Sequence, residues 1–360
     1  MLSRRDFLKM SAAALALTAT GRSAQCATNG LPGSSAEAAT SLRQLADKRG
    51  LLLGSAFANH ALNQDKQYGE ILAREFNCIV GENNMKMDLI QRTRGEFDFT
   101  HADSMMEFAA RHEMKVRAVP LVWHEALPRW ARDKTFPRQD AMDILKEHIF
   151  AVMRHFKGRV IAWDVLNEGL NDKGPGLRKK SVWHQSIGPD YVDKVYHWAH
   201  EADPEAVLFY NDYNMDGMSP SSDRCYKWAK EMLARGVPLH GIGLQYHVQA
   251  HNHPAQESAM RNIRRFNDLG LAVHITELDV WLPVKATEKH LEQQANVYRS
   301  VIETALASPK CPAVVLWGFT DRYSWVHSTS NGQYDHGLIF DREYRPKPAY
   351  AAIAAALQRR

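Results

Sequence analysis

Two glutamate residues stand at the ends of apolar runs, where their side chains could perform acid–base chemistry. Glu168 closes the segment WDVLNE, and Glu277 lies at the centre of the segment ITELD. When two carboxyl groups face one substrate, one can donate a proton to a departing oxygen while the other attacks carbon or activates water. A lone glutamate at a strand end is more often part of a surface ion pair, but two in these settings favour catalysis. We therefore predict that Glu168 and Glu277 form a catalytic pair.

The two glutamates can meet only if the fold brings together strands that are far apart in the sequence. After residue 40, apolar runs alternate with amphipathic stretches, and the runs 160–166 and 313–317 are almost wholly apolar. Such runs are typical of parallel strands that are buried on both faces. The expected strands end near Ala58, Asn83, His124, Glu168, Asn211, His247, Glu277 and Trp317.

Helix patterns separate these strands. The spacing of one helix face recurs at Val192, Val195, Tyr196 and Ala199. Gly158, Gly236 and Gly270 each stand just before a strand, where a left-handed residue can end a helix. Eight strand–helix repeats predict an α/β protein with a single catalytic domain, a (β/α)8 or TIM barrel, over residues 40–360. The C-terminal ends of barrel strands surround one pocket, so both glutamates should face it.

The motifs around both glutamates resemble those of glycoside hydrolase family ten, and further motifs follow in the order of that family. They are ENNMK at 82–86, LVWH at 121–124, NDY at 211–213, GIGLQYH at 241–247 and LWGFTD at 316–321, with Ser324 and Trp325 just beyond. The resemblance covers about residues 42–357. It implies an endo-β-1,4-xylanase that binds xylan or xylo-oligosaccharides and needs no cofactor.

The resemblance also implies a retaining mechanism with two displacement steps. Glu277 would be the nucleophile, and Glu168 would act first as the acid and then as the base. The two carboxyl groups should then lie about 5–5.5 Å apart. Glu168 must be protonated at the working pH, which burial and the negative charge of Glu277 would favour. Glu277 must stay ionised, which requires hydrogen-bond donors around it.

Other residues match family positions that support the glutamates or hold the sugar. The resemblance implies that His247 donates to Glu277 and is oriented by Asp279. Asn167 and Gln245 would hold the sugar and the nucleophile, with Asn167 addressing the 2-hydroxyl group. The predicted substrate-binding residues are Glu82, Asn83, Lys86, His124, Trp130, Tyr213, Trp317 and Trp325. Any one tryptophan could instead pack in the core, as we predict for Trp123 and Trp163, which lie inside strands and are core or supporting residues.

The sequence departs from the family pattern at a few places near these motifs. Met87 follows Lys86, where the family usually has tryptophan. Glu125 and Ala126 follow the LVWH motif, where Ser-Gln is common, and Arg92 stands where proline is frequent. None of these changes touches the two glutamates, so they bear on the outer sugar subsites.

Two other functions compete with the xylanase prediction. The same fold and chemistry could act on β-1,4-glucan or mixed-linkage glucan, because the space around the C5 position of the sugar decides between glucose and xylose. A non-catalytic carbohydrate-binding barrel would be favoured if either glutamate were missing, but both are present. A phosphoryl-transfer or nucleotide-binding function is disfavoured, because no glycine-rich phosphate loop follows any expected strand.

Composition sets further limits on partners and cofactors. The 360 residues include 45 basic and 41 acidic side chains, and a net charge of +4 does not indicate nucleic acid as a partner. His247, His251 and His253 lie close together, but their spacing is not that of a zinc site, so we predict no metal. Of four cysteines, Cys26 lies in the leader described next. The others are expected to be buried thiols, although one disulfide is compatible with export.

The first 39 residues are predicted to be an export leader rather than part of the barrel. The run SRRDFLK begins at Ser3, and its Arg4-Arg5 pair followed by Phe-Leu-Lys is typical of a twin-arginine (Tat) signal. The apolar stretch 10–19 is too short for a membrane span. A Sec-type signal with a chance Arg-Arg pair is the alternative. We expect residues 1–39 to be removed or disordered, and the mature protein to be a periplasmic or extracellular monomer without a membrane partner.

Overall fold

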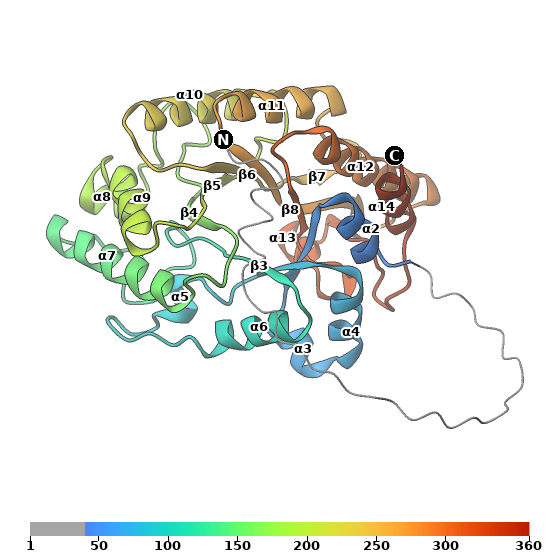
Figure 1. The fold of residues 1–360 in the computed structure, drawn as a ribbon, viewed down its shortest axis with the longest axis horizontal. Coiled ribbons are helices and arrows are strands. Elements are labelled where there is room, and N and C mark those ends of the chain that lie inside the picture. The colour runs from blue at the N-terminus through green and yellow to red at the C-terminus, as the bar shows by residue number, and fades with distance from the viewer. Residues whose placement is uncertain (1–39, 360) are drawn as a thin grey trace, which may run out of the picture.

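Eight parallel strands form a nearly closed ring with helices outside it (Figure 1). The structure is a computed structural model, and it describes residues 40–359. The ring strands are β1 (Leu52–Phe57), β2 (Cys78–Gly81), β3 (Lys115–Arg117), β4 (Trp163–Asn167), β5 (Leu208–Asp212), β6 (Gly241–Leu244), β8 (Ala272–Pro283) and β9 (Ala313–Leu316). They pair in the order β3-β2-β1-β9-β8-β6-β5-β4. Single parallel bridges, Ala118 to Trp163 and Val122 to Leu166, join the third segment to the fourth. The predicted (β/α)8 barrel is confirmed.

The helices that cover the ring follow from amphipathic segments between the strands. The longer ones are α4 (Lys66–Glu75), α6 (Thr100–Arg111), α7 (Arg138–His155), α9 (Tyr191–Ala202), α10 (Pro220–Ala234), α11 (Gln256–Asp268), α12 (Glu288–Ala307) and α14 (Pro348–Gln358). Shorter ones are α2 (Leu42–Arg49), α3 (Asn59–Gln64), α5 (Met87–Ile90), α8 (Val182–Ile187), α13 (Val326–Thr329) and the 3-10 turn η1 (Asp321–Tyr323). The predicted apolar face of α9 is buried at all four positions. Gly158, Gly236 and Gly270 have positive φ angles of 72°, 75° and 90°, as expected before a strand.

The structure differs from the sequence-based expectation in three of the strands. The third strand ends at Arg117, because Pro120 lacks an N–H group and interrupts the ladder before the segment that ends at His124. The sixth strand ends at Leu244, and after a break at Tyr246, where φ is 65°, a separate strand β7 (His247–Gln249) begins. The seventh strand continues to Pro283, well past Glu277.

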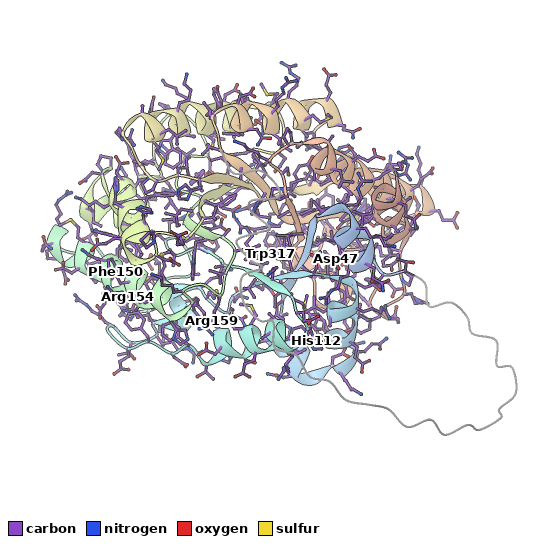
Figure 2. All side chains as sticks on the ribbon, viewed as in Figure 1. Asp47, His112, Phe150, Arg154, Arg159 and Trp317 are labelled. Carbon is purple, nitrogen blue, oxygen red and sulfur yellow. The ribbon has the colours of Figure 1, made fainter. Side chains whose placement is uncertain are left out.

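The extension of β8 is supported on both edges. Strand β7 pairs with it in parallel, and the short strand β10 (Tyr334–Asp335) pairs with it antiparallel. The part of β8 that pairs with β7 and β10 extends beyond the ring, toward the mouth of the barrel. In Figure 2, Trp317 lies toward the middle of the view, whereas Phe150 and Arg154 lie on the outer helix α7.

The ring strands are buried and mostly apolar, with a buried ion pair between Arg117 and Asp164 among them. All residues of β1 and β9 are buried. Cys78 and Cys225 are buried free thiols, as predicted for them. Among residues 40–359, no helix is both long enough and apolar enough to cross a membrane. The predicted leader, Cys26 included, lies outside the described residues.

Candidate active site

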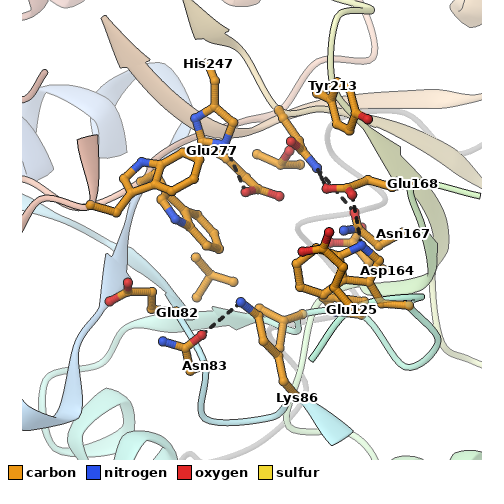
Figure 3. A pocket seen from close by; sticks show the side chains of 18 of the residues that line it. Glu82, Asn83, Lys86, Glu125, Asp164, Asn167, Glu168, Tyr213, His247 and Glu277 are labelled. Atoms are coloured by element: carbon orange, nitrogen blue, oxygen red, sulfur yellow. Dashed lines mark hydrogen bonds and ion pairs between the residues drawn. The ribbon is translucent and has the colours of Figure 1, made fainter. Parts of the chain in front are cut away.

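A cavity of about 510 Å³ opens at the C-terminal ends of the ring strands (Figure 3). Of the residues predicted from the sequence, the structure places on its wall Glu82, Asn83, Lys86, Asn167, Glu168, Tyr213, Gln245, His247, Glu277, Trp317 and Trp325. These residues lie within or beyond six of the ring strands, so only the closed ring brings them together. Asp279 lies buried behind the wall, where it contacts His247.

Glu168 follows β4 directly, and its backbone has an uncommon conformation. Its φ angle is 52°, in the left-handed region that is unfavourable for residues other than glycine. Its N–H group donates to the carbonyl oxygen of Asn211 at 2.9 Å, across to the end of β5. Such a conformation costs on the order of 1–3 kcal/mol and persists only where neighbouring contacts hold it. The sharp turn at Glu168 directs its side chain into the cavity.

The carboxyl group of Glu168 accepts hydrogen bonds from two neutral donors. Gln245 Nε2 donates to Oε1 and Trp123 Nε1 donates to Oε2, both at 2.9 Å. Burial raises the pKa of Glu168 above its usual value, and the two hydrogen bonds oppose that rise without cancelling it. The negative charges of Glu277 and Glu125 raise the pKa further. The surroundings of Glu168 therefore stabilise its protonated form more than water does.

The carboxyl group of Glu277 has a charged donor instead. His247 Nε2 lies 3.2 Å from Oε2, and Asn211 Nδ2 donates to Oε1 at 2.7 Å. Burial alone would raise the pKa of Glu277, but the hydrogen bond and charge of His247, with Asn211 and the charge of Lys86, hold it below its usual range. The site therefore favours the ionised form of Glu277.

His247 can supply that charge because a second carboxylate faces its other nitrogen. Nδ1 lies 2.9 Å from Asp279 Oδ1. Burial lowers the pKa of His247, but the charge and hydrogen bonding of Asp279, together with Glu277, outweigh it and raise the pKa to about 10. At neutral pH the ring is therefore an imidazolium, with both N–H groups donating to carboxylates.

Three amide side chains connect the two glutamates. Asn211 Nδ2 donates to Asn167 Oδ1 at 2.9 Å as well as to Glu277, and Gln245 Nε2 lies 3.4 Å from the same Asn167 oxygen. Thr276 Oγ1 in turn donates to Asn211 Oδ1 at 2.7 Å. Asn211 was not among the predicted site residues. Asn211 stands at the end of the fifth expected strand, much as Asn167 stands at the end of the fourth. This shared position could have predicted its place in the site.

Asp279 also fixes two indole rings at the mouth of the cavity. Trp281 Nε1 donates to Asp279 Oδ1 at 2.6 Å, and Trp325 Nε1 donates to Oδ2 at 2.7 Å. The two rings meet edge to face with their centroids 6.0 Å apart. Trp281 lines the cavity but was not predicted. Glu277, Asp279 and Trp281 are alternate residues of one strand and so point to one face, which is a signal the sequence already contained.

The opposite wall carries a lysine between aromatic rings. Lys86 Nζ donates to Asn83 Oδ1 at 2.9 Å and lies 5.1 Å from the ring centroid of Trp123 and 5.8 Å from that of Trp317. Trp123, predicted as a core or supporting residue, lines the cavity and supports Glu168 directly. Trp163, by contrast, is 1% exposed and belongs to the core.

Two predicted substrate-binding residues do not lie on the cavity wall. Trp130 Nε1 donates to the backbone oxygen of Gln91 at 2.9 Å, so its N–H group is already engaged. His124 is largely covered, and burial lowers its pKa to about 4, so it is a neutral ring at working pH. Among the family departures, Met87 is buried in α5, whereas Glu125 lies on the wall and is exposed.

The described residues hold no group of three histidine, cysteine or carboxylate side chains arranged to bind a metal ion. His251 and His253 are exposed in the loop after β7, and His253 Nδ1 faces the oxygen of Pro254.

Comparison with known proteins places this chain in a family. The family model described as "Glycosyl hydrolase family 10" matches residues 41–356. The chain belongs to glycosyl hydrolase family 10. This membership confirms the resemblance seen in the motifs and makes the chain a glycoside hydrolase. A second model, for the twin-arginine translocation pathway signal sequence, matches residues 1–21, so this family 10 hydrolase carries a Tat export signal, as predicted.

Several relatives of this family 10 enzyme are known. It is 40% identical over 320 residues to endo-1,4-beta-xylanase B of Thermotoga neapolitana, covering 88% of this chain and 91% of the relative. The crystal structure of xylanase 10B from Thermotoga petrophila in complex with xylobiose superposes with a TM-score of 0.85 at 40% identity, covering 88% and 97% of the two chains. A relative named exoglucanase XynX, from Acetivibrio thermocellus, is 36% identical over 315 residues, covering 84% of this chain and 28% of the relative.

Proposed function

We propose that this hydrolase is a retaining endo-β-1,4-xylanase that cleaves internal bonds of xylan and xylo-oligosaccharides by double displacement. The observation that carries the proposal is that the pKa values of two carboxyl groups on one cavity are shifted in opposite directions. Burial raises the pKa of Glu168, while the imidazolium of His247 keeps the pKa of Glu277 low. A proton donor and a nucleophile are the pair that glycosidic cleavage requires.

In the first step Glu277 attacks the anomeric carbon, and the bond from that carbon to the departing oxygen breaks. Glu168 gives its proton to that oxygen, which leaves as a hydroxyl group of the released chain. In the second step Glu168, now ionised, takes a proton from water. The water oxygen attacks the anomeric carbon, and Glu277 departs as a carboxylate.

The amide and aromatic groups around the pair would hold the sugar. Asn167 Oδ1 is occupied by two N–H neighbours, which fixes the orientation of its amide and leaves Nδ2 to donate to the 2-hydroxyl group. Glu82, Asn83 and Lys86 can bridge vicinal hydroxyl groups, and Trp317 and Trp325 can cover ring faces. We propose that Tyr213, His124 and Trp130 contact the sugar chain farther from the cleavage point.

The competing substrate is β-1,4-glucan or mixed-linkage glucan. The name of the A. thermocellus relative keeps this alternative open. The hydrogen bond from Trp325 to Asp279 favours xylan, because it fixes the indole and leaves little freedom to make room for a hydroxymethyl group at C5. A solely carbohydrate-binding role is disfavoured by the supported carboxyl pair.

The test is to assay purified mature protein on xylan, carboxymethyl cellulose and mannan, and to separate the products by chromatography. Short and intermediate xylo-oligosaccharides are expected from xylan from the earliest times. The first anomer released from an aryl xylobioside, observed by proton NMR, should be the β form. Release of the α anomer would contradict retention, and faster hydrolysis of cellulose than of xylan would favour the glucanase alternative.

We also propose that residues 1–39 form the export leader and residues 40–360 the catalytic domain, which acts as a monomer. The support for this division is that the Tat signal model matches residues 1–21 and the family model matches residues 41–356. Size-exclusion chromatography of the exported protein, with mass spectrometry of its N-terminus, tests both statements.

A further inference from the structure

Arg178 joins the backbone of Glu168 to the loop that follows it. Its Nε donates to the carbonyl oxygen of Glu168 at 2.9 Å. Since the N–H group of Glu168 is bonded to the end of β5, both backbone polar groups of this left-handed residue are held from outside. The Arg178 side chain is only 14% exposed, so its bond to the Glu168 carbonyl oxygen is largely shielded from solvent.

The other donors of Arg178 hold two partners beside the cavity. Nη1 and Nη2 bind both carboxylate oxygens of Asp172 at 2.9 Å each, and Nη2 also donates to Tyr213 Oη at 3.0 Å. The Tyr213 hydroxyl group donates to Asp172 in turn. A planar guanidinium suits this set, because it presents several N–H groups in a fixed fork.

The segment between Glu168 and Arg178 folds back on itself as a short hairpin. Leu170 forms an antiparallel bridge with Leu177, and the N–H group of Arg178 donates to the oxygen of Gly169 at 2.8 Å. Asp172 lies on the outgoing arm of the hairpin and Arg178 on the returning arm. The arginine therefore closes the hairpin and anchors it to the glutamate from which it starts.

We propose that Arg178 is a positioning residue for proton donation by Glu168, a role that rests on the proposed function of that glutamate. Its bond to the Glu168 carbonyl stabilises the left-handed turn that aims the carboxyl group at the departing oxygen. Without it, the turn can relax toward an ordinary conformation, and the acid loses its alignment while Glu277 keeps its own. Misplacement by about 1 Å can cost up to roughly 10²-fold in rate.

The experiment compares leaving groups on the mature enzyme and on Arg178→Met. A series of aryl β-xylobiosides with different phenol acidities is used, and kcat/KM is plotted against leaving-group pKa. Proton donation matters little for 2,4-dinitrophenolate and much for phenolate. The variant is therefore expected to lose up to roughly 10²-fold on phenyl xylobioside and under about threefold on the dinitrophenyl compound. The plot should become steeper.

Matched variants separate positioning from other roles. Arg138→Met removes another arginine that binds an aspartate through two N–H groups, at 3.1 and 2.6 Å to Asp190, but on the outer surface. It should leave the slope unchanged. Tyr213→Phe removes the hydroxyl group that contacts Arg178 and Asp172 but leaves the bond from Arg178 to the Glu168 carbonyl oxygen, so it should lower kcat/KM equally for all leaving groups. Arg178→Lys keeps the charge but not the fork, so its slope should be intermediate, and it serves if the methionine variant does not fold.

The outcomes distinguish this proposal from the proposed function. A steeper slope in the Arg178 variants, absent when Glu168 is already alanine, supports positioning through Glu168. An equal loss on all leaving groups would overturn it, however large the loss, because the acid would still be aligned. If Glu168→Ala itself showed no dependence on the leaving group, the acid assignment would fail, and the positioning role with it.

Discussion

The two glutamates of this site differ in surroundings more than in position, and the difference explains how one residue type serves two roles. Glu277 is covered from solvent but faces the imidazolium of His247, so its charged form is stabilised. Glu168 is covered as well, but its donors are the neutral amide of Gln245 and the indole of Trp123. Neutral donors do not offset burial, and its neighbouring charges are negative.

Burial raises the pKa of both carboxyl groups, so the imidazolium that faces Glu277 and not Glu168 accounts for the opposite directions of their pKa shifts. The cation exists because Asp279 faces the far nitrogen of His247 and raises its pKa to about 10. Asp279 itself is completely buried and accepts three N–H groups, from His247, Trp281 and Trp325. Substitutions of the two glutamates, of His247 and of Glu125 on the cavity wall therefore test separate causes of the difference between the two carboxyl groups.

The largest effect is expected from Glu277→Ala. Removing the nucleophile should lower kcat on xylan by several orders of magnitude while the melting temperature shows a folded protein. Azide should restore turnover of an activated aryl xylobioside and give the α-glycosyl azide, because it attacks the anomeric carbon directly from the vacated side. Near-normal activity in this variant, measured by product release from xylan, would remove the nucleophile assignment.

A large but selective effect is expected from Glu168→Ala. General acid catalysis contributes about 10²–10⁴-fold, so xylan hydrolysis should fall by that order. The value of kcat/KM for 2,4-dinitrophenyl xylobioside, whose leaving group needs no proton, should fall far less. Equal losses on the two substrates would show that Glu168 does not donate the proton and would break the contrast with Glu277.

A smaller effect, with a clear pH signature, is expected from His247→Gln. Glutamine can donate to Glu277 but carries no charge. A hydrogen bond to a charged group contributes about 1.5–3 kcal/mol, and since glutamine keeps the donor and removes only the charge, kcat/KM at the optimum should fall by less than the roughly ten- to 150-fold of complete loss. The pKa of Glu277 should rise without the imidazolium, and since Glu277 must be ionised, the acidic limb of the pH profile should move to higher pH.

The exposed His253, changed to glutamine, serves as the control for His247. It lies in the loop after β7, so its pH profile should match that of the parent enzyme. An unmoved acidic limb in His247→Gln would mean that hydrogen bonding alone, without charge, sets the protonation of Glu277.

Much of this arrangement could be predicted from the sequence, because its strands repeat and its motifs stand at their ends. The barrel, the family and the Tat signal are confirmed, and the structure brings Glu168, Glu277 and His247 onto one cavity. The roles of these side chains stay predictions. The strand lengths were harder to predict: Pro120 ends the regular part of the third strand early, and the long β8 depends on pairing with β7 and β10.

The missed and misplaced residues share one cause, which is side-chain direction. Trp123 lies in an apolar run, where composition cannot distinguish a core indole from one whose N–H group points to a carboxyl group. Trp130 is an aromatic residue of the type that stacks on sugar rings, yet its N–H group donates to the backbone oxygen of Gln91. Asn211 stands in a predicted motif, but its bonds to both Asn167 and Glu277 depend on how strands four, five and seven meet.

The smallest effect is expected from Glu125→Gln, which tests the negative surroundings of Glu168. Glu125 departs from the family pattern and lies on the cavity wall. Its negative charge raises the pKa of Glu168, with a smaller effect than burial or the charge of Glu277. The nearby His124 does not neutralise it, because its Nε2 is 3.7 Å away and burial lowers the pKa of that ring to about 4. Removing the charge should lower the pKa of Glu168. Since Glu168 must be protonated, the alkaline limb of kcat/KM should move to lower pH.

The size of this shift is limited by solvent, and that limit gives the sharpest test. The Glu125 side chain is 65% exposed, and exposed charge interactions contribute about 0.2–1 kcal/mol, so kcat/KM on the alkaline side should fall only about 1.4- to 5-fold. Salt screens such charges over about 10 Å at 0.1 M and about 3 Å at 1 M, so the profiles of parent and variant should converge as salt is raised. Glu292→Gln, an exposed change on the outer helix α12, should leave the limb in place at every salt concentration. A shift in Glu125→Gln that persists in 1 M salt would mean that the side chain acts through a direct contact in the bound complex rather than through its charge.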